Sequence, residues 1–165
     1  MVENQQRIYI ETSVVSYLTA RPSMNVQACA WQSVTTDWWE RQRNKFSLFT
    51  SQLVVEEASR GNEEAARRRL EVLQQIPHVA ISNEVVLLAQ TLISDGALPQ
   101  VASDDALHVA LAAVHNLDYL LTWNCRHIHN AQKQPLIRQV CSNKGYRYPE
   151  ICTPLELSGE DDHDR

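Results

Sequence analysis

Short apolar runs alternate along the chain with longer segments in which apolar side chains recur every three or four residues. The short runs are rich in β-branched and aromatic side chains, which favours strands over helices. Five such runs lie at residues 7–10, 46–51, 78–82, 118–123 and 150–157, the last including a turn. This pattern predicts about five strands.

The longer segments have the periodicity of helices that bury one face. They cover residues 12–20, 23–44, 52–60, 63–76, 83–96, 103–114 and 130–143. Helix stop signals follow several of them, namely Pro22, Gly61, Pro77 and Gly96. Ser51, and either Thr12 or Ser13, are the expected N-caps, because their hydroxyls can accept from the first free backbone N–H groups.

Alternation of strands and helices is typical of an α/β fold with a parallel sheet. We therefore expect a three-layer sandwich with helices on both faces of the sheet. No repeat or low-complexity linker divides the chain, so we expect a single domain over residues 1–157. Residues 158–165 form an acidic C-terminal tail.

The charge balance argues against broad, non-specific attraction to nucleic acid. The 165-residue chain has a net charge of −5. The tail holds four of the 20 acidic and one of the 15 basic residues, and the remainder has a charge of −2. No run approaches the roughly 20 apolar residues of a membrane span, and the start lacks the features of a signal peptide. We expect a cytoplasmic protein with no membrane partner.

The cysteines and the His127-x-His129 pair predict no zinc site. The four cysteines are scattered, without a C-x-x-C pair, and are expected to be buried, reduced thiols. A zinc site requires more ligands than two histidines supply.

Two adjacent acids, Asp104 and Asp105, open a helix that is otherwise almost entirely apolar. Between residues 106 and 114 only His108 is polar. Buried carboxylates are costly unless they are paired, hydrogen-bonded or bound to a cation.

Other polar side chains lie beside buried elements: Glu11 and Asn124 follow predicted strands, and Glu56 and Glu57 lie on the helix that Ser51 is expected to cap. In open α/β sheets ligands bind beyond the carboxyl ends of the strands. Several carboxylates gathered there would suit a hard divalent cation, Mg²⁺ or Mn²⁺.

Four motifs carry a resemblance to a known family: YIETSVVSYL, SQLVVEEASRG, SDDALHVALAA and LLTWNCRHI, in this order. With them the sequence resembles the PIN-domain proteins, the family that includes the VapC toxins of toxin–antitoxin pairs. The resemblance implies a sheet of about five parallel strands, an acidic metal site and Mg²⁺-dependent cleavage of RNA.

The resemblance also implies which residues act. Glu11 stands where the family usually has Asp before Thr-Ser, and Glu57 stands four residues before Gly61. Asp105 begins the D-A-L-H motif, and Asn124 replaces an acid that is often Asp. These four are the expected catalytic and metal-binding residues. Four further residues are expected to be auxiliary. Thr12 and Ser13 could hold a metal-bound water, and Asp104 could ligate the metal or interact with the dipole at the helix terminus. Glu56 is the solvent-facing alternative to Glu57.

The expected function is that of a Mg²⁺- or Mn²⁺-dependent endoribonuclease, with the toxin of a type II pair as a specific form of it. Its expected partners are single-stranded or structured RNA, an antitoxin protein and a second copy in a homodimer. The alternative is a catalytically weak or inactive PIN-like module that binds nucleic acid or protein. Trp31 and Trp38, seven residues apart on one helix with Trp39 adjacent, belong to the core, to such an interface, or to an RNA-stacking surface.

Overall fold

Strands and helices alternate through residues 4–159, which are the residues that the structure, a computed structural model, describes. The strands are β1 (Arg7–Ile10), β2 (Ser47–Phe49), β3 (Tyr119–Leu121) and β4 (Glu150–Cys152). The helices are α1 (Thr12–Thr19), α2 (Val26–Arg41), α3 (Gln52–Ala58), α4 (Glu63–Leu73), α5 (Asn83–Ser94), α6 (Ser103–Val114) and α7 (Gln134–Asn143). Two short 3₁₀ helices, Arg43–Lys45 and Gln100–Ala102, complete the order.

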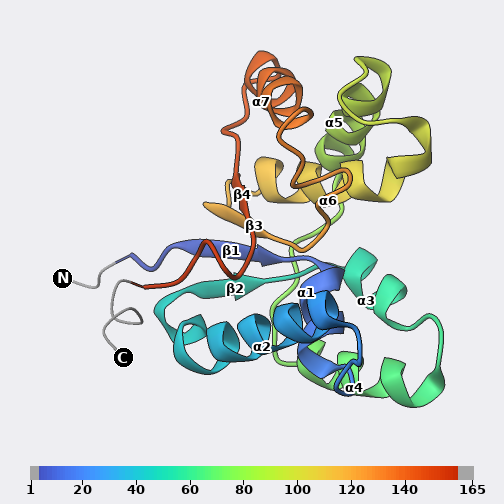
Figure 1. Ribbon diagram of the computed structural model, residues 1–165. Helices are drawn as coiled ribbons and strands as arrows, with labels where there is room; N and C mark the ends of the chain where they lie inside the picture. Colours follow the sequence, from blue (N-terminus) through green and yellow to red (C-terminus); the bar gives the residue numbers. More distant parts are fainter. Residues whose placement is uncertain (1–3, 160–165) are drawn as a thin grey trace.

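The strands form one parallel sheet in the order β2-β1-β3-β4. Helices α1 to α4 lie on one side of it, and α5 to α7 lie on the other (Figure 1). Covering both faces requires apolar strands, and Ile8, Tyr9 and Ile10 of β1 are fully buried. The predicted three-layer α/β fold is therefore confirmed.

The predicted fifth strand, residues 78–82, is reduced to an isolated parallel bridge between Thr50 and His78. Thr50 N donates to Pro77 O, and Val79 N donates to Thr50 O. The segment then turns away from the sheet, because Ser82 is already the N-cap of α5 and its hydroxyl accepts from Val85 N. The sheet of the described residues thus has four strands rather than five.

The starts of the helices follow the local sequence closely, with two differences. Asn25 caps α2, so this helix starts three residues later than expected. Helix α7 starts at Gln134 rather than near residue 130, with Pro135 in its first turn, where the missing N–H of proline costs no hydrogen bond. Within residues 4–159 no helix is both long and apolar enough to cross a membrane.

The tryptophans pack within the molecule. Trp38 is buried, and its Nε1 donates to Leu157 O. Trp31 stacks on Trp123 with ring centroids 4.6 Å apart, and Tyr17 meets both rings edge-on. Core packing is thus the role of Trp38 and of Trp123, which is also buried, while Trp31 is partly exposed.

The C-terminal part adds the last strand to the sheet, because β4 pairs with β3. One domain over residues 1–157 stays a prediction. The predicted acidic tail falls mainly on residues 160–165, which lie outside the described residues.

Asp118 joins the starting ends of β1 and β3. Its Oδ2 accepts from Arg7 N at 2.7 Å, and its Oδ1 accepts from the Arg147 guanidinium at 3.0 Å. Burial by itself raises the pKa of Asp118, but the Arg7 N–H and the hydrogen bond and charge of Arg147 lower it by more. The pKa of this carboxyl therefore lies below its ordinary value of 3.8.

Asp118→Asn should lower the free energy of unfolding by about 1–2 kcal/mol near neutral pH, because it weakens two charge-assisted hydrogen bonds. A lowered folded-state pKa stabilises the protein above the unfolded value, and this contribution is lost as the pH falls through the folded value. Urea titrations at several pH values should therefore show the difference between wild type and variant shrinking below about pH 4.

The matched control is Asp95→Asn, since Asp95 is exposed at the end of α5. This change should alter stability by less than about 0.5 kcal/mol at any pH. Equal losses in the two variants, or a difference that persists in acid, would contradict the assigned role of Asp118.

Candidate metal centre

The candidate site lies where β1 and β3 end side by side. Ile10 pairs with Leu121, and the next residue, Glu11, donates its backbone N–H to Leu121 O. Thr122 follows β3 at the same edge. Because parallel strands bring their carboxyl ends together, Glu11 and Thr122 become neighbours although 111 residues separate them.

Glu11 is a nearly buried carboxylate, 5% exposed, that also caps α1. Its Oε2 accepts from Ser13 N at 3.0 Å, from Thr122 Oγ1 at 2.8 Å and from the Ser13 hydroxyl. The prediction that Thr12 or Ser13 caps this helix was wrong, because the longer side chain of Glu11 folds back onto the first turn. Within the described residues its Oε1 makes no hydrogen bond.

Glu57 comes from α3 and faces inward. Its Oε1 accepts from Thr12 Oγ1 at 2.6 Å and lies 2.5 Å from His108 Nε2. Its other oxygen, Oε2, makes no hydrogen bond within residues 4–159. The neighbouring Glu56 is exposed, so the expected competitor of Glu57 lies on the solvent side of the helix.

The pKa of Glu57 is set by opposing effects. Burial by itself raises it, but the hydrogen bond and positive charge of His108 lower it by more. The Thr12 hydroxyl and Arg60 act in the same direction, so this pKa lies below the ordinary value of 4.5. Glu57 is therefore a carboxylate near neutral pH.

His108 is the residue that sequence reasoning missed. It is fully buried on α6, with Nε2 on Glu57 and Nδ1 2.7 Å from Tyr9 Oη. Burial alone would lower the pKa of His108. The hydrogen bond that His108 makes to Glu57 and the charges of Glu11, Glu57 and Asp105 outweigh burial, so this pKa is raised above 6.5. The available signal was its place as the only polar residue between Ala106 and Val114.

Glu11, Glu57 and His108 form a compact donor group, since one donor atom from each lies within 4.8 Å of the others. Such spacing is close enough for ligands of one ion, with bonds of about 2.0–2.6 Å. The unpaired oxygens Glu11 Oε1 and Glu57 Oε2 are the donors that Mg²⁺ and Mn²⁺ prefer. By the chemistry of these donors, the two carboxylates suit a hard divalent cation.

Asp105 and Asn124 form a second, outer part of the site. Asn124 Nδ2 donates to Asp105 Oδ1 at 3.0 Å, and His127 Nδ1 lies 2.9 Å from Asp105 Oδ2. The backbone N–H of His127 donates to Asn124 Oδ1. The structure thus pairs Asp105 with Asn124, but not within the compact donor group of Glu11, Glu57 and His108. Asp104 is half-buried in the first turn of α6.

The two parts are linked through α6 and through Thr122. Asp105 and His108 are three residues apart on α6 and so share one face of the helix. Thr122 Oγ1 donates to Glu11 and accepts from Asn124 N at 2.9 Å. Hydrogen bonds therefore connect Glu11, Asn124 and Asp105, while Glu57 is tied to them through His108 on α6.

His127 and His129 contact different acidic partners. His129 Nε2 contacts Glu156 at 2.6 Å, whereas His127 contacts Asp105. All four cysteines are free. Two of them are exposed rather than buried as predicted, Cys29 and Cys125.

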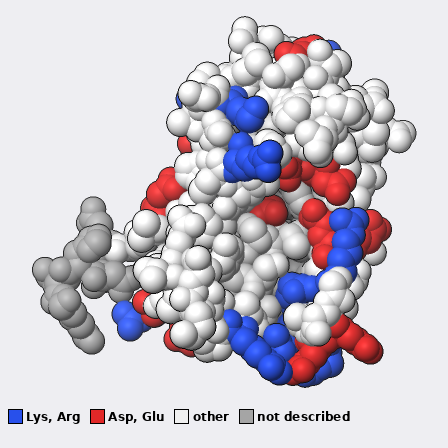
Figure 2. Space-filling view, turned by 45° about the vertical axis from the view of Figure 1, so that its right-hand side comes forward, with Lys and Arg blue, Asp and Glu red and all other residues white. Residues whose placement is uncertain are grey.

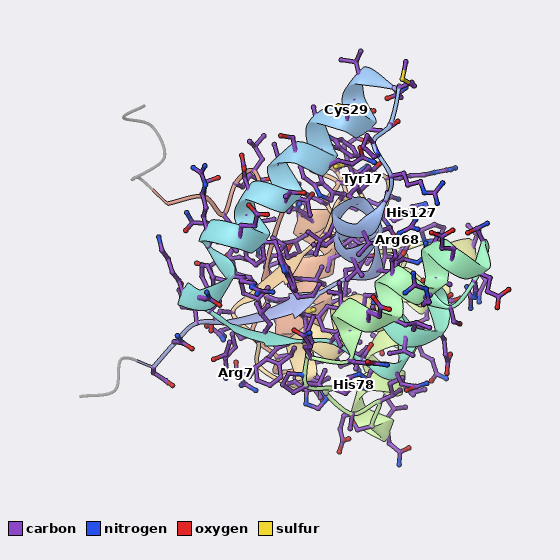
Figure 3. All side chains as sticks on the ribbon, turned by 90° about the horizontal axis from the view of Figure 1, so that it is seen from below. Arg7, Tyr17, Cys29, Arg68, His78 and His127 are labelled. Carbon is purple, nitrogen blue, oxygen red and sulfur yellow. The ribbon has the colours of Figure 1, made fainter. Side chains whose placement is uncertain are left out.

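Acidic side chains gather along a hollow of the surface, and basic ones lie above and below it (Figure 2). Seen from below, Arg7 lies near the start of β1 and His127 lies beyond the arrowhead of that strand (Figure 3). The Asp118 contacts and the acidic site thus occupy opposite ends of the sheet. A hollow with acids inside and bases around it can hold a cation and attract a phosphate backbone.

A family model described as PIN domain matches residues 8–131. The matched segment contains Glu11, Glu57, Asp105 and Asn124, and also His108. Among curated proteins, none matches the chain.

Mn²⁺ should raise the melting temperature of the wild type, because it binds the folded carboxylate pair and not the unfolded chain. At one hundred times the Kd the gain is about 2.7 kcal/mol, or about 5–10 °C for a protein of this size. Glu57→Gln should remove most of this shift in differential scanning fluorimetry.

Glu56→Gln is the matched control, with the same substitution on the same helix but an exposed side chain. It should keep the full shift. If both variants or neither lost the shift, the ion would bind somewhere other than Glu57.

Asn124→Asp should lower the melting temperature without metal and enlarge the shift produced by Mn²⁺. The change replaces the donor of the 3.0 Å bond to Asp105 by a second carboxylate, and like charges at this distance repel unless a cation lies between them. Asn83→Asp, on an exposed first turn, should leave the Mn²⁺ shift unchanged. A variant that is as stable as wild type without metal would show that Asp105 and Asn124 do not interact.

Proposed function

Because the chain belongs to the PIN-domain family, whose members are typically nucleases, we propose that it is a metal-dependent endoribonuclease. One observation carries this proposal: Glu11 and Glu57, from separate elements, place ligand atoms within 4.8 Å of one another at the carboxyl end of a parallel sheet. Among residues 4–159, each keeps one oxygen without a hydrogen bond. Asp105 and Asn124 are proposed to complete the site from α6 and from the end of β3.

The proposed reaction is hydrolysis of an RNA phosphodiester bond, in which water adds to phosphorus and one P–O bond breaks. Glu11 and Glu57 would hold Mg²⁺ or Mn²⁺, which would polarise the phosphate and make a water more acidic. Ser13 and Thr122 fix one oxygen of Glu11. Thr12 and His108 fix one oxygen of Glu57, so both carboxylates are oriented before substrate arrives. Such preorganisation favours catalysis over simple ion binding.

RNA in single-stranded or structured form is the proposed substrate, and a VapC-like toxin of a type II pair is the proposed biological role. The four motifs that resemble this group support the role. An antitoxin and a second copy of the chain are proposed partners, and the cytoplasm is the proposed compartment. Exposed apolar side chains on and beside α5, among them Leu87 and Val101, support a protein interface.

A binding module without useful activity is the second candidate. Asn124 lacks the charge that the family often has at its position, and Asp105 already has two partners, Asn124 and His127. Both features support a weak metal site. This candidate requires RNA or protein binding without cleavage.

The purified protein should cleave RNA oligonucleotides with Mg²⁺ or Mn²⁺, and EDTA should stop the reaction. Glu11→Gln and Asp105→Asn should each lower the rate by at least about 100-fold, because they remove carboxylates that would hold or orient the metal. Glu40→Gln, an exposed change on α2, should cleave as fast as wild type. The measurement is gel-resolved cleavage of single-stranded and hairpin RNA.

The same experiment separates the two candidates. If wild type cuts no RNA with either metal while Asn124→Asp does, the native protein is the binding module. If Glu11→Gln cuts as fast as wild type, the activity belongs to another site or to a contaminant.

A further inference from the structure

A row of buried, hydrogen-bonded side chains leads away from Glu57. Ser51 Oγ lies 2.8 Å from Tyr9 Oη, which lies 2.7 Å from His108 Nδ1, and His108 Nε2 lies 2.5 Å from Glu57 Oε1. Ser51, Tyr9 and His108 are each fully buried. They come from the N-cap of α3, from β1 and from α6, so three elements meet in this row.

The direction of these hydrogen bonds determines where the protons are. Glu57 Oε1 already accepts from the Thr12 hydroxyl at 2.6 Å, and a carboxylate oxygen in this role only accepts. His108 Nε2 must therefore carry the hydrogen that points at Glu57. A ring nitrogen that bears a hydrogen has no lone pair for a metal, so this hydrogen bond and metal ligation by Nε2 exclude each other.

Tyr9 and Ser51 accommodate both protonation states of the ring. With neutral His108, Nδ1 accepts from the Tyr9 hydroxyl. With protonated His108, Nδ1 donates to Tyr9 Oη, and the Tyr9 hydroxyl donates to Ser51 Oγ. The Tyr9 phenol keeps its own hydrogen in either case, because it donates either to His108 or to Ser51. Nε2–H faces Glu57 in both states.

We propose that His108, held by Tyr9, is a positioning residue for Glu57 and not a metal ligand. It fixes Glu57 Oε1 together with Thr12, and among residues 4–159 Oε2 keeps no hydrogen bond that would compete with a cation. This inference rests on the proposed metal site at Glu11 and Glu57 and names how one of its ligands is oriented. Groups that hydrogen-bond a ligating side chain typically change metal affinity by about 10–100-fold when they are removed.

The test is Mn²⁺ binding followed by electron paramagnetic resonance, which counts free Mn²⁺ and detects a directly bound ¹⁴N by its electron spin-echo modulation. Wild type should bind Mn²⁺ without a directly bound ¹⁴N. His108→Leu, which keeps bulk and removes the donor, should weaken binding about 10–100-fold. His108→Gln, which keeps an N–H donor toward Glu57, should recover most of the affinity.

Two controls match these changes. His115→Leu alters an exposed contact with Ala80 O just beyond the end of α6, and it should leave the Mn²⁺ affinity unchanged. Tyr9→Phe should lower the affinity by less than His108→Leu, whereas Tyr148→Phe, which removes a hydroxyl just before β4, should not lower it. Circular dichroism of each variant confirms that affinities are compared among folded proteins.

The outcomes distinguish this inference from the function on which it rests. A ¹⁴N signal in wild type that disappears in His108→Gln makes His108 a ligand and overturns the inference, even if His108→Leu fails to fold. Unchanged affinity in His108→Leu, with loss in Glu57→Gln, overturns the inference alone. Absence of Mn²⁺ binding by wild type overturns the proposed function and this inference with it.

Discussion

The charge of Glu11 is the constraint on which the site is built. A carboxylate that is 5% exposed must be met by donors, and here the donors are the hydroxyls of Ser13 and Thr122 and one backbone N–H. Each hydroxyl also accepts a backbone N–H from the segment after β3, from Trp123 and Asn124 respectively. The start of α1 and the turn after β3 are therefore folded around a single carboxylate.

Helix α6 is the second element that holds the side chains of the site in place. It presents His108 to Glu57 and Asp105 to Asn124 from one face, while its other faces are packed in the core. Its all-round apolar sequence secures its position by burial. A helix packed in this way cannot rotate without exposing apolar surface. The core therefore sets the distance between the compact donor group and the outer pair of Asp105 and Asn124.

The arrangement also explains how an acidic cluster can fold before any cation binds. Hydroxyl groups hydrogen-bond to the carboxylate of Glu11, and His108 hydrogen-bonds to that of Glu57. Asn124 and His127 hydrogen-bond to the carboxylate of Asp105. Asn124 matters here because an acid at its position would face Asp105 directly. An amide at this position therefore avoids repulsion between two carboxylates in the absence of a cation.

The sequence by itself determined the α/β alternation, because the spacing of apolar side chains that distinguishes strands from helices is visible within short runs of neighbouring residues. Its motifs also singled out Glu11, Glu57, Asp105 and Asn124. Only the tertiary structure decided that Glu11 caps α1, that residues 78–82 leave the sheet after one bridge, and that His108 lies between Tyr9 and Glu57. Hydrogen bonds across 40 to 110 residues depend on which strands become neighbours, and no local pattern encodes that choice.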